Sequence, residues 1–164
     1  MYTIRKSRPE DLPEMQRIYR GARLFMRQNG NPDQWGDSYP EEALLRDDIA
    51  KGRSYLCIED GEIAATFCWY IGDEEAYHRI VNGPGWQNDA PYGVLHRIAA
   101  AHRRGGAASF CAEWCLLKHP NLRVDTHRDN LPMQHCLEKN GFTFCGVVYL
   151  EDGSERLAYQ KLAE

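Results

Sequence analysis

The sequence has no long hydrophobic run. None of its 164 residues lies in a stretch that approaches the roughly 20 apolar residues a helix needs to cross a bilayer. The start, Met1 to Lys6, has no apolar segment of signal-peptide type. Positive charge is not clustered either, because the net charge of −4 comes from interspersed acids and bases. Binding to a phosphate backbone needs a basic face, so we expect no binding to nucleic acid. From the lack of a long apolar run and of a signal-type segment, we expect a cytoplasmic protein that does not bind membranes.

The cysteines lack the spacing of a metal site. Most of the six lie inside strongly apolar stretches, such as residues 66–70, and are expected to be buried free thiols. Cys111 and Cys115 would share a helix face, yet no second pair matches them as a zinc site requires. We therefore expect no metal.

The composition is that of an ordinary globular protein, with 43% hydrophobic and 27% charged residues. A chain of this length is typical of one domain, here residues 1–164, and we find no repeat or linker. In the first half we expect a strand at residues 2–7, a helix at 8–27, a loop at 28–40, a short helix at 41–51 and a β-hairpin at 54–71. Asp60-Gly61 marks the hairpin turn, and an irregular segment with a helical turn follows to residue 91.

The second half alternates strands and helices. We expect a strand at residues 92–100, a helix at 106–118, a second strand at 122–127, a second helix at 130–140 and a closing hairpin at 142–161. The helix between the two strands implies that they pair in parallel.

A turn of small residues joins the strand at 92–100 to its helix. Residues 103–109 read Arg-Arg-Gly-Gly-Ala-Ala-Ser, so backbone N–H groups can approach a diphosphate, and the helix N-terminus adds partial positive charge. Arg103 and Arg104 supply formal charge. The alternative is a tight turn with solvated arginines. Walker and dinucleotide-binding motifs do not fit this spacing.

This turn and a later motif together resemble the GNAT N-acetyltransferase superfamily. The pyrophosphate loop of that family reads Arg/Gln-x-x-Gly-x-Gly/Ala, with Arg103, Gly106 and Ala108 in these positions. The family then has a strand, an asparagine at the start of a helix and a Lys-x-Gly-Phe sequence at its end. Asn130 and the run Lys139 to Phe142 match this order, and the resemblance covers essentially the whole chain.

The resemblance implies a mixed α/β (α+β) fold. Its sheet of about seven strands is largely antiparallel, contains one splayed parallel pair and is flanked by about four helices. It also implies acetyl-CoA or another acyl-CoA as co-substrate. The residues it assigns to CoA are Ile98, Ala99, Ala100, Arg103, Arg104, Gly105, Gly106, Ala107, Ala108, Ser109, Asn130 and Leu137.

The chain departs from the family at the general acid. Many members place a tyrosine four residues before the glycine of Gly-Phe, where this sequence has Leu137. Cys136 lies about 100° further round the helix and is expected in the core. His96 and His127 are candidate general bases because both lie near the splayed strand ends, although each could instead be structural.

The acceptor is expected to be an amine. Trp35 and Tyr70 are candidate acceptor-binding residues, and Trp35 could alternatively fill the core. Clustered carboxylates at 47–48 or 73–75 leave a polycationic acceptor open.

The leading hypothesis is an N-acetyltransferase that transfers an acetyl group to a primary amine of a small molecule or peptide by direct attack. A non-catalytic acyl-CoA sensor and an unrelated nucleotide-binding domain are the alternatives. The closing hairpin is a candidate surface for a homodimer.

Overall fold

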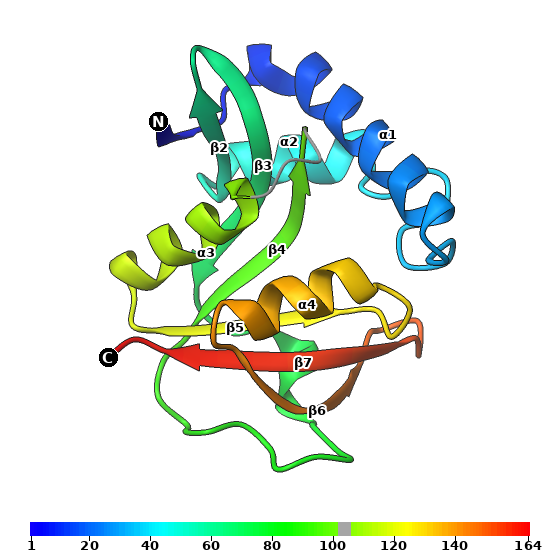
Figure 1. Ribbon diagram of the computed structural model, residues 1–164, viewed down its shortest axis with the longest axis vertical. Helices are drawn as coiled ribbons and strands as arrows, with labels where there is room; N and C mark the ends of the chain where they lie inside the picture. Colours follow the sequence, from blue (N-terminus) through cyan, green and yellow to red (C-terminus); the bar gives the residue numbers. More distant parts are fainter. Residues whose placement is uncertain (102–105) are drawn as a thin grey trace.

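The computed structural model describes residues 1–101 and 106–164 (Figure 1). The described strands are β1 Tyr2–Lys6, β2 Ser54–Glu59, β3 Glu62–Ile71, β4 Gly93–Ala100, β5 Asn121–Thr126, β6 Thr143–Tyr149 and β7 Glu155–Leu162. The described helices are α1 Leu12–Gln28, α2 Glu42–Ala50, α3 Ala107–Lys118 and α4 Leu131–Lys139, with 3-10 turns η1 Pro9–Asp11 and η2 Glu75–His78. The strands and α-helices expected from the sequence are confirmed, with small shifts at their ends.

The strands form one seven-stranded sheet in the order β1-β2-β3-β4-β5-β7-β6 (Figure 1). Every neighbouring pair is antiparallel except β4 and β5. These two parallel strands pair only at Gly93 with Leu122 and at Val94 with Arg123, and they diverge beyond this point. The predicted mixed sheet with a splayed parallel pair is therefore confirmed.

The β2–β3 hairpin turns at Asp60-Gly61, as the sequence predicts. Both residues have positive φ, +52° and +80°, which is the backbone of a type I′ turn. Asparagine, aspartate and glycine tolerate this conformation best, so the Asp-Gly pair sets the register of the hairpin.

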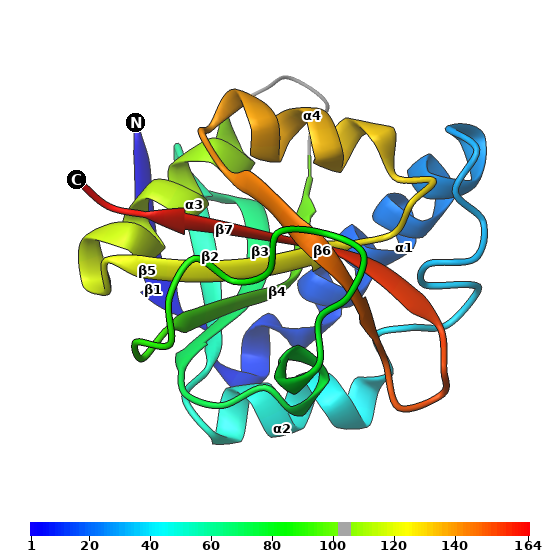
Figure 2. The ribbon, with the colours of Figure 1, turned by 90° about the horizontal axis from the view of Figure 1, so that it is seen from below.

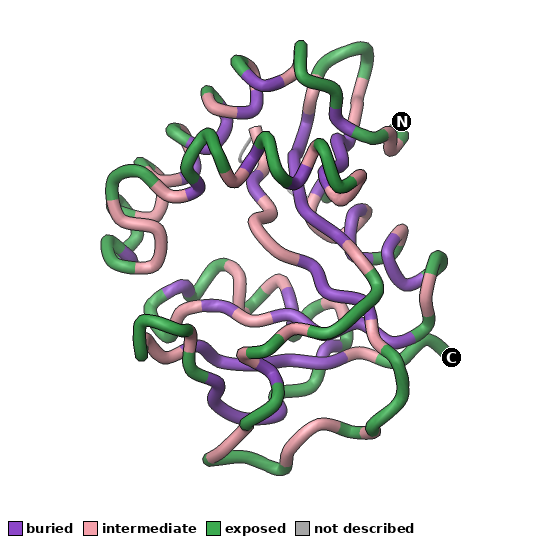
Figure 3. Tube along the Cα trace, turned by 180° about the vertical axis from the view of Figure 1, so that it is seen from behind, coloured by how far each residue is buried: buried purple, intermediate pink, exposed green. Residues whose placement is uncertain are grey.

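Helices cover both faces of the sheet (Figure 2). Adjacent residues of β2 point to opposite sides, because Leu56 packs with α1 and α2 whereas Cys57 packs with α3. Buried positions accordingly concentrate in the central strands and in the helix faces turned toward them (Figure 3).

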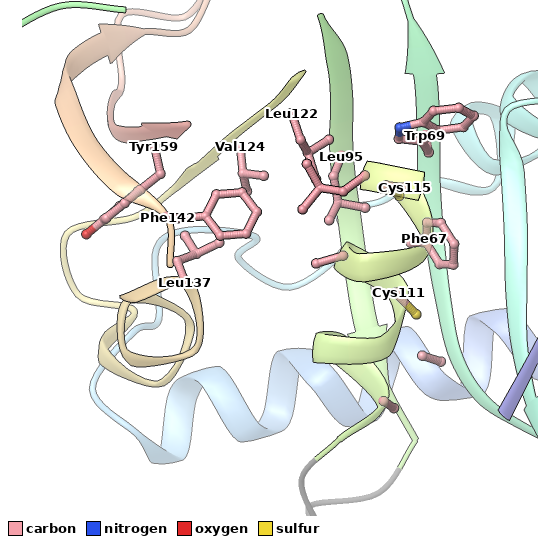
Figure 4. Packing of buried hydrophobic residues seen from close by; sticks show 14 of the residues in the cluster. Phe67, Trp69, Leu95, Cys111, Cys115, Leu122, Val124, Leu137, Phe142 and Tyr159 are labelled. Carbon is pink, nitrogen blue, oxygen red and sulfur yellow. The ribbon is translucent and has the colours of Figure 1, made fainter. Parts of the chain in front are cut away.

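The largest core cluster joins the two halves of the sheet (Figure 4). Phe67, Trp69 and Leu95 pack with α3, and Phe142 and Tyr159 lie in the same cluster on the far side of the divergence. All six cysteines are unpaired thiols, and five of them are buried. The expectation of buried free thiols is confirmed for those five.

No helix in the described ranges has both the length and the apolar character needed to cross a membrane. Within residues 1–101 and 106–164, no three His, Cys, Asp or Glu side chains gather as metal ligands would.

Candidate active site

Two adjoining cavities lie where β4 and β5 diverge. The first, which we call the α4 cavity, has a volume of about 400 Å³ and is bounded by α1, the end of β4, the start of α3 and α4. The second, the α2 cavity, has a volume of about 660 Å³ and is bounded by the 29–41 loop, α2, β3, β4 and β5. Met26, Ile98, Asn130 and Met133 line both cavities and so mark their junction.

Most of the residues expected to bind CoA line the α4 cavity. They are Ile98, Ala99, Ala100, Gly106, Ala107, Ala108, Ser109 and Asn130. Arg103, Arg104 and Gly105, which belong to the same expectation, lie outside the described residues.

Leu137 and Cys136 exchange the positions expected of them. Leu137 is only 3% exposed, does not line the α4 cavity, and lies beside Phe142 in the core (Figure 4). Cys136 is half-buried and lines the cavity, so its assignment to the core is wrong. The helical periodicity separates the two residues correctly, but the tertiary packing of α4 decides which of them faces the cavity.

The start of α3 is suited to an anion. Gly106 is the N-cap with φ of +116°, no side-chain hydrogen bond caps the helix there, and its first turn has no acidic residue. The following three residues line the α4 cavity, so the positive end of the helix faces it. This arrangement fits the diphosphate of a nucleotide cofactor.

A bulge in β4 lies beside the junction. The register of β3 with β4 shifts by one residue between Thr66 and Cys68, and Arg97 has a left-handed φ of +53°. The Arg97 guanidinium donates two hydrogen bonds to the Asp48 carboxylate, at 2.9 and 2.8 Å. The backbone carbonyl of Arg97 accepts a hydrogen bond from the Tyr19 hydroxyl at 2.6 Å. A strained backbone is thus fixed from both sides, immediately before Ile98.

His96 joins a network of polar groups in the α2 cavity. Its Nε2 lies 3.1 Å from Glu74 Oε2, which also accepts a hydrogen bond from the Tyr70 hydroxyl at 2.9 Å. Its Nδ1 lies 4.0 Å from Asp125 Oδ2, and the same oxygen accepts a hydrogen bond from Tyr77 at 2.6 Å. The imidazole therefore lies between two carboxylates, each held by a tyrosine.

The pKa shifts in this network distinguish an ionised carboxylate, Glu74, from two neutral tyrosines. The hydrogen bond with His96 lowers the pKa of Glu74 to about 2, although burial acts in the opposite direction. Burial, reinforced by the neighbouring carboxylates, raises the pKa of Tyr70 and of Tyr77. Glu74 is therefore ionised and too weak to act as a base near neutral pH, and both tyrosines are hydrogen-bond donors.

The other predicted site residues have different positions. His127 lines neither cavity, and its Nδ1 accepts a hydrogen bond from the Asp129 amide at 3.0 Å, so the structure does not bring it to the junction. Tyr70 lines the α2 cavity. Trp35 lines it too and packs against Tyr19 at 5.7 Å between ring centroids, so its position agrees with both of the roles considered.

Several residues at the site carry no sequence motif, although the acidic run 73–75 is a candidate acceptor feature. Glu74 follows β3 in an acidic run that resembles a solvated loop, and Arg53 precedes β2 with no motif around it. Thr126 is fully buried at the end of β5, where only the divergence of the strands makes it part of the α2 cavity.

No protein-family profile matches the sequence, and no curated protein matches it either. Among solved structures, the fold is that of acetyltransferases. A putative acetyltransferase from Staphylococcus aureus Mu50 shares 22% identity, with 99% of each chain covered and a TM-score of 0.71. A ribosomal-protein-alanine N-acetyltransferase from Brucella melitensis shares 17%, with 98% of this chain and 99% of that chain covered and a TM-score of 0.62.

A much stronger similarity gives the family. The crystal structure of a GNAT-family acetyltransferase from Streptococcus agalactiae 2603 is 35% identical, covers 99% of this chain and 96% of that chain, and has a TM-score of 0.91. The chain belongs to the GNAT family of acetyltransferases.

Proposed function

We propose that the protein is an acetyl-CoA-dependent N-acetyltransferase that acts on a primary amine of a small molecule or peptide by direct attack. The observation that carries this proposal is the junction of the two cavities, because it gives a thioester and an amine separate sites that meet at Ile98 and Asn130. Holding two reactants in line supplies a large part of such a rate enhancement.

The α4 cavity is the proposed site for acetyl-CoA, which supplies the activated acetyl thioester. The backbone of Ile98, Ala99 and Ala100 would bind the pantetheine amides, since β4 has left its parallel partner by this point. Residues 106–109 would bind the diphosphate at the start of α3, and Asn130 would lie near the thioester. Arg103, Arg104 and Gly105 remain part of this proposal.

His96 is the proposed general base. When its Nε2–H donates to Glu74, the Nδ1 lone pair is available to accept a proton from the amine as it attacks the carbonyl carbon. Asp125 would stabilise the imidazolium that forms. We assign no general acid, because Leu137 is in the core and a thiolate is a tolerable leaving group.

The proposal is tested by continuous detection of free CoA thiol with acetyl-CoA and a broad amine panel. His96→Gln should lower kcat by about 10² to 10⁴. His127→Gln is the matched control, since it makes the same change in a nearby histidine that lines neither cavity, and it should leave kcat nearly unchanged. Equal effects of the two substitutions would contradict the role of His96.

A second pair of variants tests the cofactor site. Gly106→Trp places a bulky side chain at the start of α3 and should abolish acetyl-CoA binding in calorimetry. Gly61→Trp also places a bulky residue at a positive φ and so controls for backbone strain, but its hairpin does not line the α4 cavity and no atom lies within 4 Å of an added Cβ, so acetyl-CoA should still bind. Parallel lines in initial-velocity plots would contradict direct attack. Binding of acetyl-CoA without CoA release for any amine would instead favour the sensor.

A further inference from the structure

Two of the six carboxylates that line the α2 cavity are neutralised by cations of the protein itself. These pairs are Asp47 with Lys51 at 2.9 Å and Asp48 with Arg97 at 2.8 Å, whereas Glu74 is hydrogen-bonded to the His96 imidazole at 3.1 Å.

Arg53, in contrast, is a cation that has no carboxylate partner within residues 1–101 and 106–164. Its guanidinium carbon lies 4.2 Å from the centroid of the Tyr70 ring, and the side chain lines the α2 cavity. In the described ranges, no Asp or Glu oxygen is recorded within ion-pair distance of it. A planar guanidinium with free donors matches the two oxygens of a carboxylate.

Tyr70 connects this cation with the proposed catalytic network. The ring centroid of His96 lies 6.2 Å from that of Tyr70, so Arg53 and His96 are both neighbours of one aromatic ring. Thr126 is among the residues that line the same cavity, but its hydroxyl is fully buried and has no hydrogen-bond partner among the described residues.

We propose that the acceptor is a small amine with a carboxylate next to its amino group, an α-amino acid or a close analogue. Arg53 binds the carboxylate, and the amino group lies between His96 and Asp125. This inference rests on the proposed N-acetyltransferase function and names its substrate class.

The test compares the common L-amino acids with their C-terminal amides in the CoA-release assay. The two sets share the side chain and differ in the carboxylate, which also raises the pKa of the α-amine, so kcat/KM is compared per concentration of free amine. For the best amino acid, wild type should show a kcat/KM about 10- to 100-fold above that for its amide, as expected for hydrogen bonds to a charged group. Arg53→Met should remove this preference by lowering kcat/KM for the acid while leaving the amide within about twofold.

Two further variants separate recognition from packing. Arg53→Lys keeps the positive charge but loses the paired N–H donors of the guanidinium, so it should retain part of the preference for the acid. Lys51→Met removes another cation of the same cavity, one already paired with Asp47, and should leave the preference intact. An equal loss for acids and amides in Arg53→Met would overturn the inference, because Arg53 would then only support Tyr70.

The remaining outcomes distinguish the inference from the function on which it rests. Turnover of amides, peptides or simple amines but of no amino acid overturns the inference and leaves the N-acetyltransferase standing. Binding of amino acids is followed separately by calorimetry with wild type and with Arg53→Met. Amino-acid binding that requires Arg53, without CoA release, supports the ligand class and refutes the enzyme, whereas neither binding nor release overturns both.

Discussion

Replacement of Asp48 by asparagine should destabilise the protein strongly, because the carboxylate neutralises a buried arginine. The side chains of Arg97 and Asp48 are only 13% and 7% exposed. Removing one member of a buried pair leaves the other charge uncompensated, at a cost of about 3 to 5 kcal/mol. Arg97 keeps a longer hydrogen bond to the Tyr39 hydroxyl at 3.3 Å, so we expect the lower end of that range, about 3 kcal/mol.

For a chain of this length, that loss corresponds to a fall in Tm of about 6 to 12 °C. Asp47→Asn is the matched control, because it makes the same chemical change one residue away, in a pair with Lys51 whose side chains are about half exposed. Such surface pairs contribute at most about 1 kcal/mol. Urea unfolding followed by tryptophan fluorescence measures both variants. A loss below about 1 kcal/mol for Asp48→Asn, or equal losses for the two, would refute the reasoning.

Two further predictions concern a carboxylate and the core. Because the pKa of Glu74 is lowered to about 2 from an ordinary value of 4.5, its ionised form stabilises the fold above pH 4.5, and this contribution is lost as the pH falls toward 2. Urea unfolding should therefore find Glu74→Gln less stable than wild type at pH 7, with the difference shrinking toward pH 2; a constant difference would contradict the assignment. Leu56→Ala, at a fully buried position, should cost about 2 to 5 kcal/mol in the same assay, whereas Leu117→Ala, 86% exposed, should cost less than about 0.5.

The local elements could be predicted because their signals are local. Asp60-Gly61 specifies a turn that needs two residues of positive φ, and the helix that begins after Asn130 has its cap in the sequence, where Oδ1 accepts a hydrogen bond from the Met133 amide at 3.1 Å. The cofactor turn could be recognised for the same reason, since small residues before a helix are visible in any sequence.

The catalytic network could not be predicted in the same way. Arg53, Glu74, His96 and Asp125 come from the start of β2, the loop after β3, β4 and β5, and nothing in their spacing relates them. Sequence reasoning included His127 because it closes a strand, but its ring caps a local turn instead. The expectation that Cys136 lies in the core was wrong. Helical periodicity gives the angle between two side chains of α4, but it does not tell which of them faces the cavity.

The sequence by itself determined the order of the strands and helices, the turn of the first hairpin and the small-residue start of α3, because each depends on backbone preferences within a few residues. Tertiary structure decided where β4 leaves β5 and which side chains meet at that point. The divergence follows two residue pairs of parallel strand and lies beside a bulge held by Asp48 and Tyr19, which are distant from Arg97 in sequence. Contacts of this kind depend on how whole elements pack, and they alone bring the two proposed substrate sites together.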